Sequence, residues 1–129
     1  MSREKPVVAI VDDDPRLIEC LEDLLESANY RARGFSSASL LLREGLSDID
    51  LLITDIGMPG MDGFELRDVV TKVRPELPVF LITGRHEIAD QDRARGVEGF
   101  FRKPFDVKRL LAAVDQALKH GDVEDGSET

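Results

Sequence analysis

The chain has few of the features that indicate a disulfide-bonded, membrane-spanning or nucleic-acid-binding protein. Its single cysteine, Cys20, cannot form an internal disulfide, so we expect a reducing location, the cytoplasm. No apolar run approaches the ~20 residues that cross a bilayer, and no signal peptide is recognisable at the N-terminus. With 26 acidic against 17 basic residues and a net charge of -9, the chain is expected not to bind nucleic acid directly.

What the chain does have is a repeated alternation of short apolar runs with stretches of helical spacing. At 129 residues and 42% hydrophobic composition, it is long enough for one core. Five alternations of this kind predict a doubly wound α/β fold, with a parallel sheet covered by helices on both faces. The runs expected to form strands are residues 7–11, 30–34, 51–54, 79–83 and 99–101.

The helices are predicted from capping residues and from apolar spacing. Asp14 can cap a helix that starts at Pro15, Ser36 or Ser37 a second one, and Asp106 the last one, which we expect to end at Gly121. A third helix contains residues 64–73, and a charged, weakly amphipathic one covers 86–95. We therefore expect one domain over residues 1–121, followed by an acidic disordered tail over 122–129.

Polar side chains follow several of the predicted strands. Asp12 and Asp13 come directly after the first strand, and Asp55 follows the third. The carboxyl ends of parallel strands meet along one crevice, so these carboxylates should lie close together. Because like charges repel, and because no histidine or cysteine is near, aspartate oxygens in this arrangement suit a hard cation such as Mg²⁺. The pattern indicates metal-assisted phosphate chemistry.

Each of these residues taken alone has an ordinary structural interpretation. Asp14 is best explained as a helix cap. Thr83 alone fits a strand residue, since β-branched residues favour strands, and Lys103 alone fits a surface lysine. Their shared place at the carboxyl edge of the sheet favours the functional interpretation of both.

Four segments of the chain together resemble the receiver domain of two-component response regulators, in the superfamily of the chemotaxis regulators. The resemblance covers residues 6 to about 120, and it implies a flavodoxin-like sheet with strand order 2-1-3-4-5. It also implies that Asp55 accepts a phosphoryl group from a sensor histidine kinase or a phosphotransfer protein. The segments that carry it are Val11–Pro15 (VDDDP), Thr54–Gly63 (TDIGMPGMDG), Ile82–Gly84 (ITG) and Lys103–Phe105 (KPF).

The resemblance also implies a set of magnesium ligands. Asp13, Asp55 and the main-chain carbonyl of Gly57 would bind Mg²⁺ directly, and Asp12 would bind it through a water molecule. This set agrees with the preference of Mg²⁺ for oxygen ligands and retained waters. Lys103 would pair with a phosphoryl oxygen, because phosphoryl transfer depends on groups that neutralise charge on those oxygens.

A conformational switch is implied as well. Thr83 would donate its hydroxyl to the phosphoryl group, which would shift the surface formed by the helix over 86–95, the strand over 99–101 and the last helix. Phe100 is the expected companion switch residue, in a position where the family more often has tyrosine. The Lys103-Pro104 bond is expected to be cis, as it is in the family.

Three other interpretations stay open. One is a small magnesium-dependent phosphohydrolase with Asp12 as nucleophile and Asp14 as acid, for which Asp12-Asp13-Asp14 also fits. A second is a binding module that is never phosphorylated. A third is the receiver portion of a longer DNA-binding regulator, whose DNA-binding part would lie elsewhere. The favoured interpretation is a signalling phosphoacceptor that catalyses only its own phosphorylation and dephosphorylation and acts on an unknown downstream protein, with a phosphorylation-dependent dimer left open.

Overall fold

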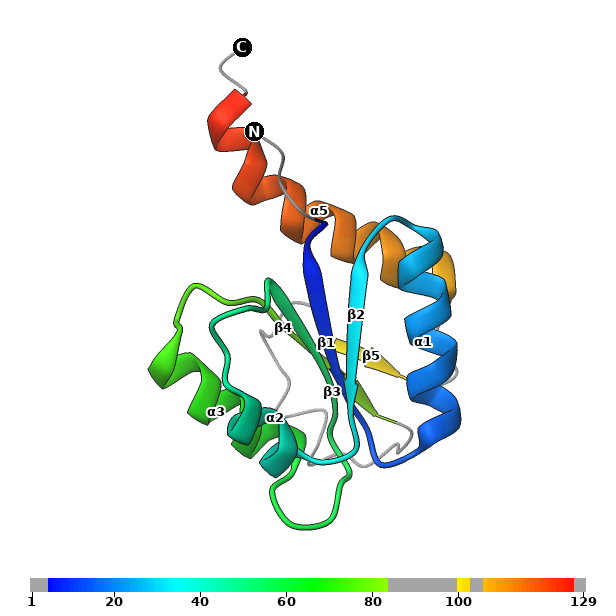
Figure 1. Cartoon of the computed structure of the whole chain (residues 1–129), viewed down its shortest axis with the longest axis vertical. Helices are drawn as coiled ribbons and strands as arrows, with labels where there is room; N and C mark the ends of the chain where they lie inside the picture. Colours follow the sequence, from blue (N-terminus) through cyan, green and yellow to red (C-terminus); the bar gives the residue numbers. More distant parts are fainter. Residues whose placement is uncertain (1–4, 84–99, 103–105, 127–129) are drawn as a thin grey trace.

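The computed structural model describes residues 5–83, 100–102 and 106–126, and of residues 100, 102 and 119–126 it describes the backbone alone (Figure 1). The helix expected over 86–95 and the Lys103-Pro104 bond lie outside the described residues. Among the helices that are described, none has the length and apolar character needed to cross a membrane.

Five parallel strands form one sheet in the order β2-β1-β3-β4-β5 (Figure 1), which confirms the expected fold class and strand order. The strand residues are mostly apolar and the three central strands are almost fully buried, as in a parallel sheet covered on both faces. The strands are β1 (Val7–Val11), β2 (Arg31–Phe35), β3 (Leu51–Asp55), β4 (Val79–Thr83) and β5 (Phe100–Arg102).

Helices cover the sheet on both faces. α1 (Pro15–Ser27) and α5 (Val107–Gly126) pack on one face, where Leu21 and Leu110 are buried against alternate residues of β1 and β3. α2 (Ala38–Glu44) and α3 (Gly63–Val73) pack on the other, where Leu41 and Leu66 are buried (Figure 1). Because side chains alternate along a strand, β1 sends Val8 and Ile10 to the first layer and Ala9 and Val11 to the second.

The helix caps predicted from the sequence are present. The carboxylate of Asp14 accepts a hydrogen bond from the N–H of Arg16 at 3.0 Å, and that of Asp106 accepts one from Lys108 at 2.9 Å. Of the two serines before α2, Ser37 is the cap. A reciprocal capping box begins α3, in which Asp62 and Glu65 each bond the other's backbone N–H at 2.9 Å.

The last helix is longer than the sequence predicted. α5 continues to Gly126, past Gly121, where we expected it to end. The expected disordered tail over residues 122–129 stays a prediction. Glycine adopts helical dihedral angles as well as left-handed ones, and no proline follows to stop the helix. In Figure 1 the C-terminal turns of α5 project beyond the sheet.

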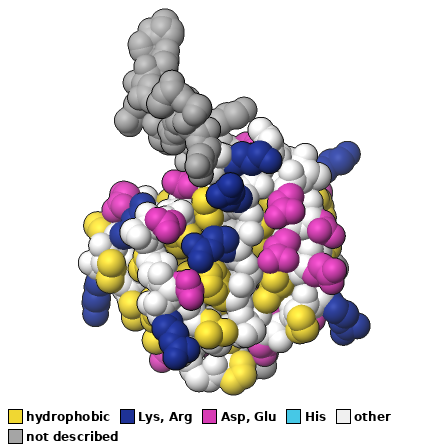
Figure 2. Space-filling model, in the orientation of Figure 1, with side chains coloured by type: hydrophobic (Ala, Val, Ile, Leu, Met, Phe, Trp, Pro, Cys, Tyr) yellow, Lys and Arg dark blue, Asp and Glu magenta, His cyan; other side chains and the backbone are white. Residues whose placement is uncertain are grey.

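Acidic side chains are not confined to the strand ends. Figure 2 shows Asp and Glu side chains gathered where α1 lies in Figure 1, with Lys and Arg side chains beside them. Glu19, Asp23 and Glu26 are exposed on α1 at helical spacing, and none of them forms an ion pair with the described residues. Acidity alone therefore does not mark the functional site.

Candidate metal and phosphoacceptor site

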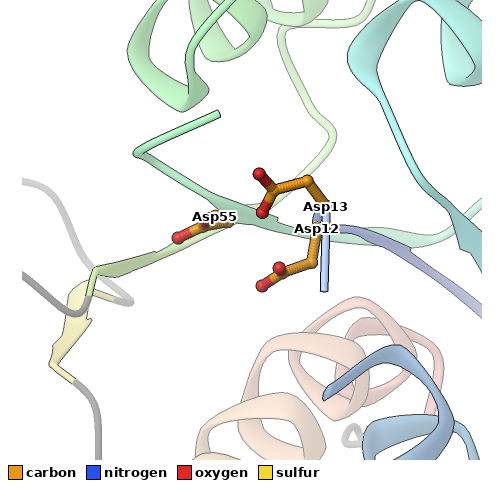
Figure 3. A group of neighbouring side chains, drawn as sticks. All are labelled: Asp12, Asp13 and Asp55. Atoms are coloured by element: carbon orange, nitrogen blue, oxygen red, sulfur yellow. The ribbon is translucent and has the colours of Figure 1, made fainter. Parts of the chain in front are cut away.

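Three carboxylates meet at the carboxyl edge of the sheet. Asp12 and Asp13 follow β1, Asp55 is the last residue of β3, and one oxygen from each lies within 4.8 Å of the others. Figure 3 shows the three side chains pointing to the same side from the two neighbouring strands. Asp12 is 2% exposed and Asp55 is 7% exposed, whereas Asp13 is open to solvent. The predicted acidic cluster is thus confirmed as a group in space.

Asp12 is held by the turn that follows β1. Its backbone N–H donates to the carbonyl of Phe35 on β2 at 3.1 Å, and its carboxylate accepts a hydrogen bond from the N–H of Asp14 at 2.8 Å. Asp14 in turn caps α1. The aspartates at the start of α1 therefore have different tasks: Asp14 begins the helix, and Asp12 and Asp13 turn their oxygens towards Asp55.

Asp55 is held where β3 gives way to the loop before α3. Its main-chain carbonyl accepts a hydrogen bond from the hydroxyl of Thr54 at 3.1 Å. The next residue, Ile56, donates its N–H to the carbonyl of Ile82 on β4 at 2.8 Å, and its carbonyl accepts from the N–H of Gly63 at 3.0 Å. The backbone around Asp55 is thereby tied both to the neighbouring strand and to the start of α3.

The donor set of the cluster fits a hard divalent cation. All three groups offer carboxylate oxygens, which Mg²⁺ and Ca²⁺ prefer, and the exposure of Asp13 leaves a side open to water. Carboxylates gathered this closely repel one another, and a bound cation would remove that repulsion. Mg²⁺ commonly takes one or two carboxylates together with water and phosphate oxygens, which suits a site at an open sheet edge.

The remaining predicted site residues are placed to different extents. Thr83 ends β4 at 2% exposure, one residue beyond Ile82, which is opposite Asp55 in the sheet register. Gly57 is exposed in the loop two residues after Asp55, and its part as a main-chain ligand stays a prediction.

On β5 only part of the prediction falls on described residues. Phe100 lies in β5 opposite Leu81, and its part as a switch residue stays a prediction. Lys103 lies outside the described residues. It follows Arg102, which is the register partner of Thr83, so β5 ends at the same edge of the sheet.

Two residues beside Asp55 were not predicted as site residues from the sequence. Thr54 is fully buried, although it is polar, and Gly63 lies against the peptide of Asp55. Thr54 could have been predicted, because a hydroxyl inside an otherwise apolar, buried strand needs a hydrogen-bond partner nearby. The close approach of Gly63 had no comparable signal, since a glycine at a helix start has several explanations.

Comparisons with known proteins agree with this geometry. The family described as "Response regulator receiver domain" matches residues 8–115. The response regulator protein TmoT of Ectopseudomonas mendocina is 34% identical over 92% of this chain and 56% of its own length. The heme response regulator HssR of Staphylococcus epidermidis is 38% identical over 85% of this chain and 50% of its own. The chain therefore spans about half the length of these curated relatives.

Solved structures give the same result. The signal receiver domain of an HD domain-containing protein from Pseudomonas fluorescens Pf-5 superposes with a TM-score of 0.82 at 27% identity. The match covers 90% of this chain and 96% of that structure, so the similarity extends over nearly the whole of both.

Proposed function

This chain belongs to the response regulator receiver domain family, and from that premise we propose that Asp55 is its phosphoacceptor. Receiver domains of this family are signalling phosphoacceptors that histidine kinases phosphorylate. The observation that carries the assignment is the cluster itself: among the described residues, Asp55 is the buried carboxylate that ends a strand within 4.8 Å of the paired acids after β1. A second candidate function has no specific observation in its favour.

The proposed step transfers a phosphoryl group to a carboxylate oxygen of Asp55. That oxygen attacks phosphorus and forms an O–P bond while the N–P bond of a phosphohistidine breaks, and the histidine nitrogen leaves with the electron pair. The reaction is mostly a matter of positioning and charge neutralisation, so the residues around Asp55 have to orient it and compensate charge.

Asp12, Asp13 and Asp55 are the residues that would hold Mg²⁺, together with the main-chain carbonyl of Gly57. In this assignment Asp13 and Asp55 bind directly, and Asp12 acts through a water molecule. The bound ion would neutralise charge on the phosphoryl oxygens. The burial of Asp12 and its hydrogen bond from Asp14 support a fixed, orienting part for this carboxylate.

Thr83 and Lys103 complete the proposed phosphoryl site. Thr83 would donate its hydroxyl to a phosphoryl oxygen, and Lys103 would pair its ammonium with another. The place of Thr83, buried at the end of β4, supports this role, since its hydroxyl could donate a hydrogen bond to a phosphoryl oxygen at the same edge of the sheet. The output would be a changed surface over the segment 86–95, β5 and α5, with Phe100 following Thr83.

The phosphohydrolase interpretation is less well supported by the contacts of its two residues. Asp14, the acid it requires, has its carboxylate engaged in capping α1 through the N–H of Arg16. Asp12, the nucleophile it requires, accepts a hydrogen bond from the N–H of Asp14 in the turn that leads into α1. Asp55 would have less to do in that mechanism, although it ends β3 within the same cluster.

Intact-mass spectrometry after incubation with Mg²⁺ and acetyl phosphate tests the assignment. The wild type should gain one phosphate and Asp55→Asn none. Asp48→Asn is the matched control, because Asp48 is an exposed aspartate with no hydrogen bond or ion pair to the described residues, before β3. An adduct that survives in Asp55→Asn would contradict the proposal and favour Asp12. If acetyl phosphate is not a donor for the wild type, a phosphorylated histidine kinase takes its place.

A further inference from the structure

The first residue of α3 lies directly against the peptide that carries the proposed phosphoacceptor. A Cβ built on Gly63 would stand 2.5 Å from the carbonyl oxygen of Asp55 and 2.8 Å from the Cα of Ile56. Both distances are shorter than real Cβ contacts. The obstructing atoms belong to the backbone, so no side-chain rotation can make room, and either α3 or the end of β3 would have to move.

The same carbonyl is held from within the strand. Thr54, which is fully buried, donates its hydroxyl to the carbonyl oxygen of Asp55 at 3.1 Å. Strand alternation places Thr54 on the same face as Leu52, the face that α2 and α3 cover. The Asp55 peptide is therefore fixed on its α3 side by one hydrogen bond and one close packing contact.

The place of Asp55 in the sheet matters because the pairing register of β3 with β4 ends at this residue. Asp55 is the last residue of β3 that pairs with β4, opposite Ile82. Beyond it, Ile56 donates its N–H to the carbonyl of Ile82 on β4 at 2.8 Å, and its carbonyl accepts the N–H of Gly63 at 3.0 Å, which joins the chain to α3. Any shift of α3 at Gly63 is thus transmitted to the Asp55 backbone, and so to a carboxylate that has to stay within 4.8 Å of two others.

We propose that Gly63 and Thr54 are positioning residues for the Asp55 carboxylate. Neither touches the reacting atoms; both set the place of the Asp55 carbonyl and, through it, the direction of the side chain. The inference rests on the proposed function of Asp55 and adds to it the two contacts that determine its reactivity. Displacements of about 1 Å in a reacting group can slow a reaction by about 100-fold, so a small shift should be measurable.

A second crowded glycine in the sheet provides the matched control. A Cβ on Gly34 of β2 would stand 2.3 Å from Cγ2 of Ile18 and 2.8 Å from a carboxylate oxygen of Glu22. These atoms belong to side chains of α1 and not to the backbone of Asp55, so the strain at Gly34 would fall on Ile18 and Glu22. Gly34→Ala therefore adds the same methyl group at an equally crowded site without pressing on the Asp55 peptide.

The test measures the initial rate of phosphorylation of wild type, Gly63→Ala, Thr54→Val and Gly34→Ala at saturating Mg²⁺, with the donor that phosphorylates the wild type. Urea unfolding of each variant gives the folded fraction, so that rates refer to folded protein. Gly63→Ala should be slowed at least about tenfold and Thr54→Val about threefold or more, whereas Gly34→Ala should stay within about twofold of wild type. Thr54→Ser keeps the hydroxyl and should restore the rate.

A folded Gly63→Ala that reacts at the wild-type rate would overturn the proposal for Gly63. If Gly63→Ala does not fold, Thr54→Val decides: a wild-type rate would overturn the proposal, and so would a slow rate that Thr54→Ser fails to restore. Phosphate that still appears on Asp55→Asn with the same donor would instead refute the function proposed for Asp55. The two failures are therefore distinguishable.

Discussion

The two edges of the parallel sheet, where the strands begin and where they end, differ in how their polar groups are arranged. At the amino edge, where the strands begin, polar groups form complementary pairs. The carboxylate of Asp50 accepts the N–H of Val7 at 2.8 Å, and the guanidinium of Arg74 donates to the carbonyls of Leu46 and Ile49 at 2.6 and 2.8 Å. Each of these contacts joins the start of one element to another, and so stabilises the fold.

At the carboxyl edge, like groups are brought together instead. Asp12, Asp13 and Asp55 place three carboxylates within 4.8 Å, an arrangement whose mutual repulsion opposes folding unless a cation binds. The comparison teaches that one sheet can separate its tasks by end, with stabilising polar contacts at one edge and, at the other, the carboxylates that we propose hold a cation. Substitutions at the two edges should therefore respond differently to Mg²⁺.

The largest difference should come from Asp13→Asn. Loss of a carboxylate ligand should weaken Mg²⁺ binding about 100-fold, equivalent to about 2.8 kcal/mol. Without Mg²⁺ the same variant should unfold at a higher urea concentration than wild type, because one of three like charges is gone. Urea midpoints measured across a Mg²⁺ titration give both quantities. Asp48→Asn should match wild type, and equal Mg²⁺ responses of all three proteins would contradict the separation of tasks.

An intermediate effect, independent of Mg²⁺, is expected for Arg74→Met at the amino edge. The substitution keeps the apolar stem and leaves two carbonyls without their donor, which should lower the free energy of unfolding by about 2 kcal/mol. Glu76→Gln is the control, because it removes only the negative charge of the exposed partner of the same guanidinium. Urea unfolding with and without Mg²⁺ should show the same loss, and a loss that depends on Mg²⁺ would break the comparison.

The smallest effect should come from Tyr30→Phe, also at the amino edge. The Tyr30 hydroxyl donates to Asp115 of α5, so its loss should lower the free energy of unfolding by about 1 kcal/mol near neutral pH. Burial, the hydrogen bond to Asp115 and its negative charge together raise the pKa of Tyr30 above its usual value. The folded state therefore keeps a proton that the unfolded state loses above pH ~10.

The sign of the pH dependence follows from this raised pKa. Wild-type stability should be fully present below pH ~10 and should fall as the pH rises further, and Tyr30→Phe should lack that added slope. Since Tyr30 is the only tyrosine and tryptophan is absent, tyrosinate absorbance reports it directly. Ionisation of the folded protein at the usual tyrosine pKa would contradict the described contact.

Local features were predicted well because they depend on residue type and spacing. The start of α1 followed from Pro15 and Asp14, and that of α5 from Asp106. The end of α5 was not predicted, since Gly121 permits both a helix and its termination. Alternation predicted a parallel α/β sheet, but the strand order came from the resemblance to receiver domains, because order depends on packing between distant segments.

The sequence by itself determined which residue types stand at or just after the ends of β1, β3, β4 and β5, namely carboxylates, a hydroxyl and a lysine. Only the tertiary structure decided that Asp12, Asp13 and Asp55 approach within 4.8 Å and that Gly63 presses on the Asp55 peptide. The physical reason is that such distances join residues far apart in the chain or on different elements. They depend on sheet register and helix packing, which no local pattern specifies.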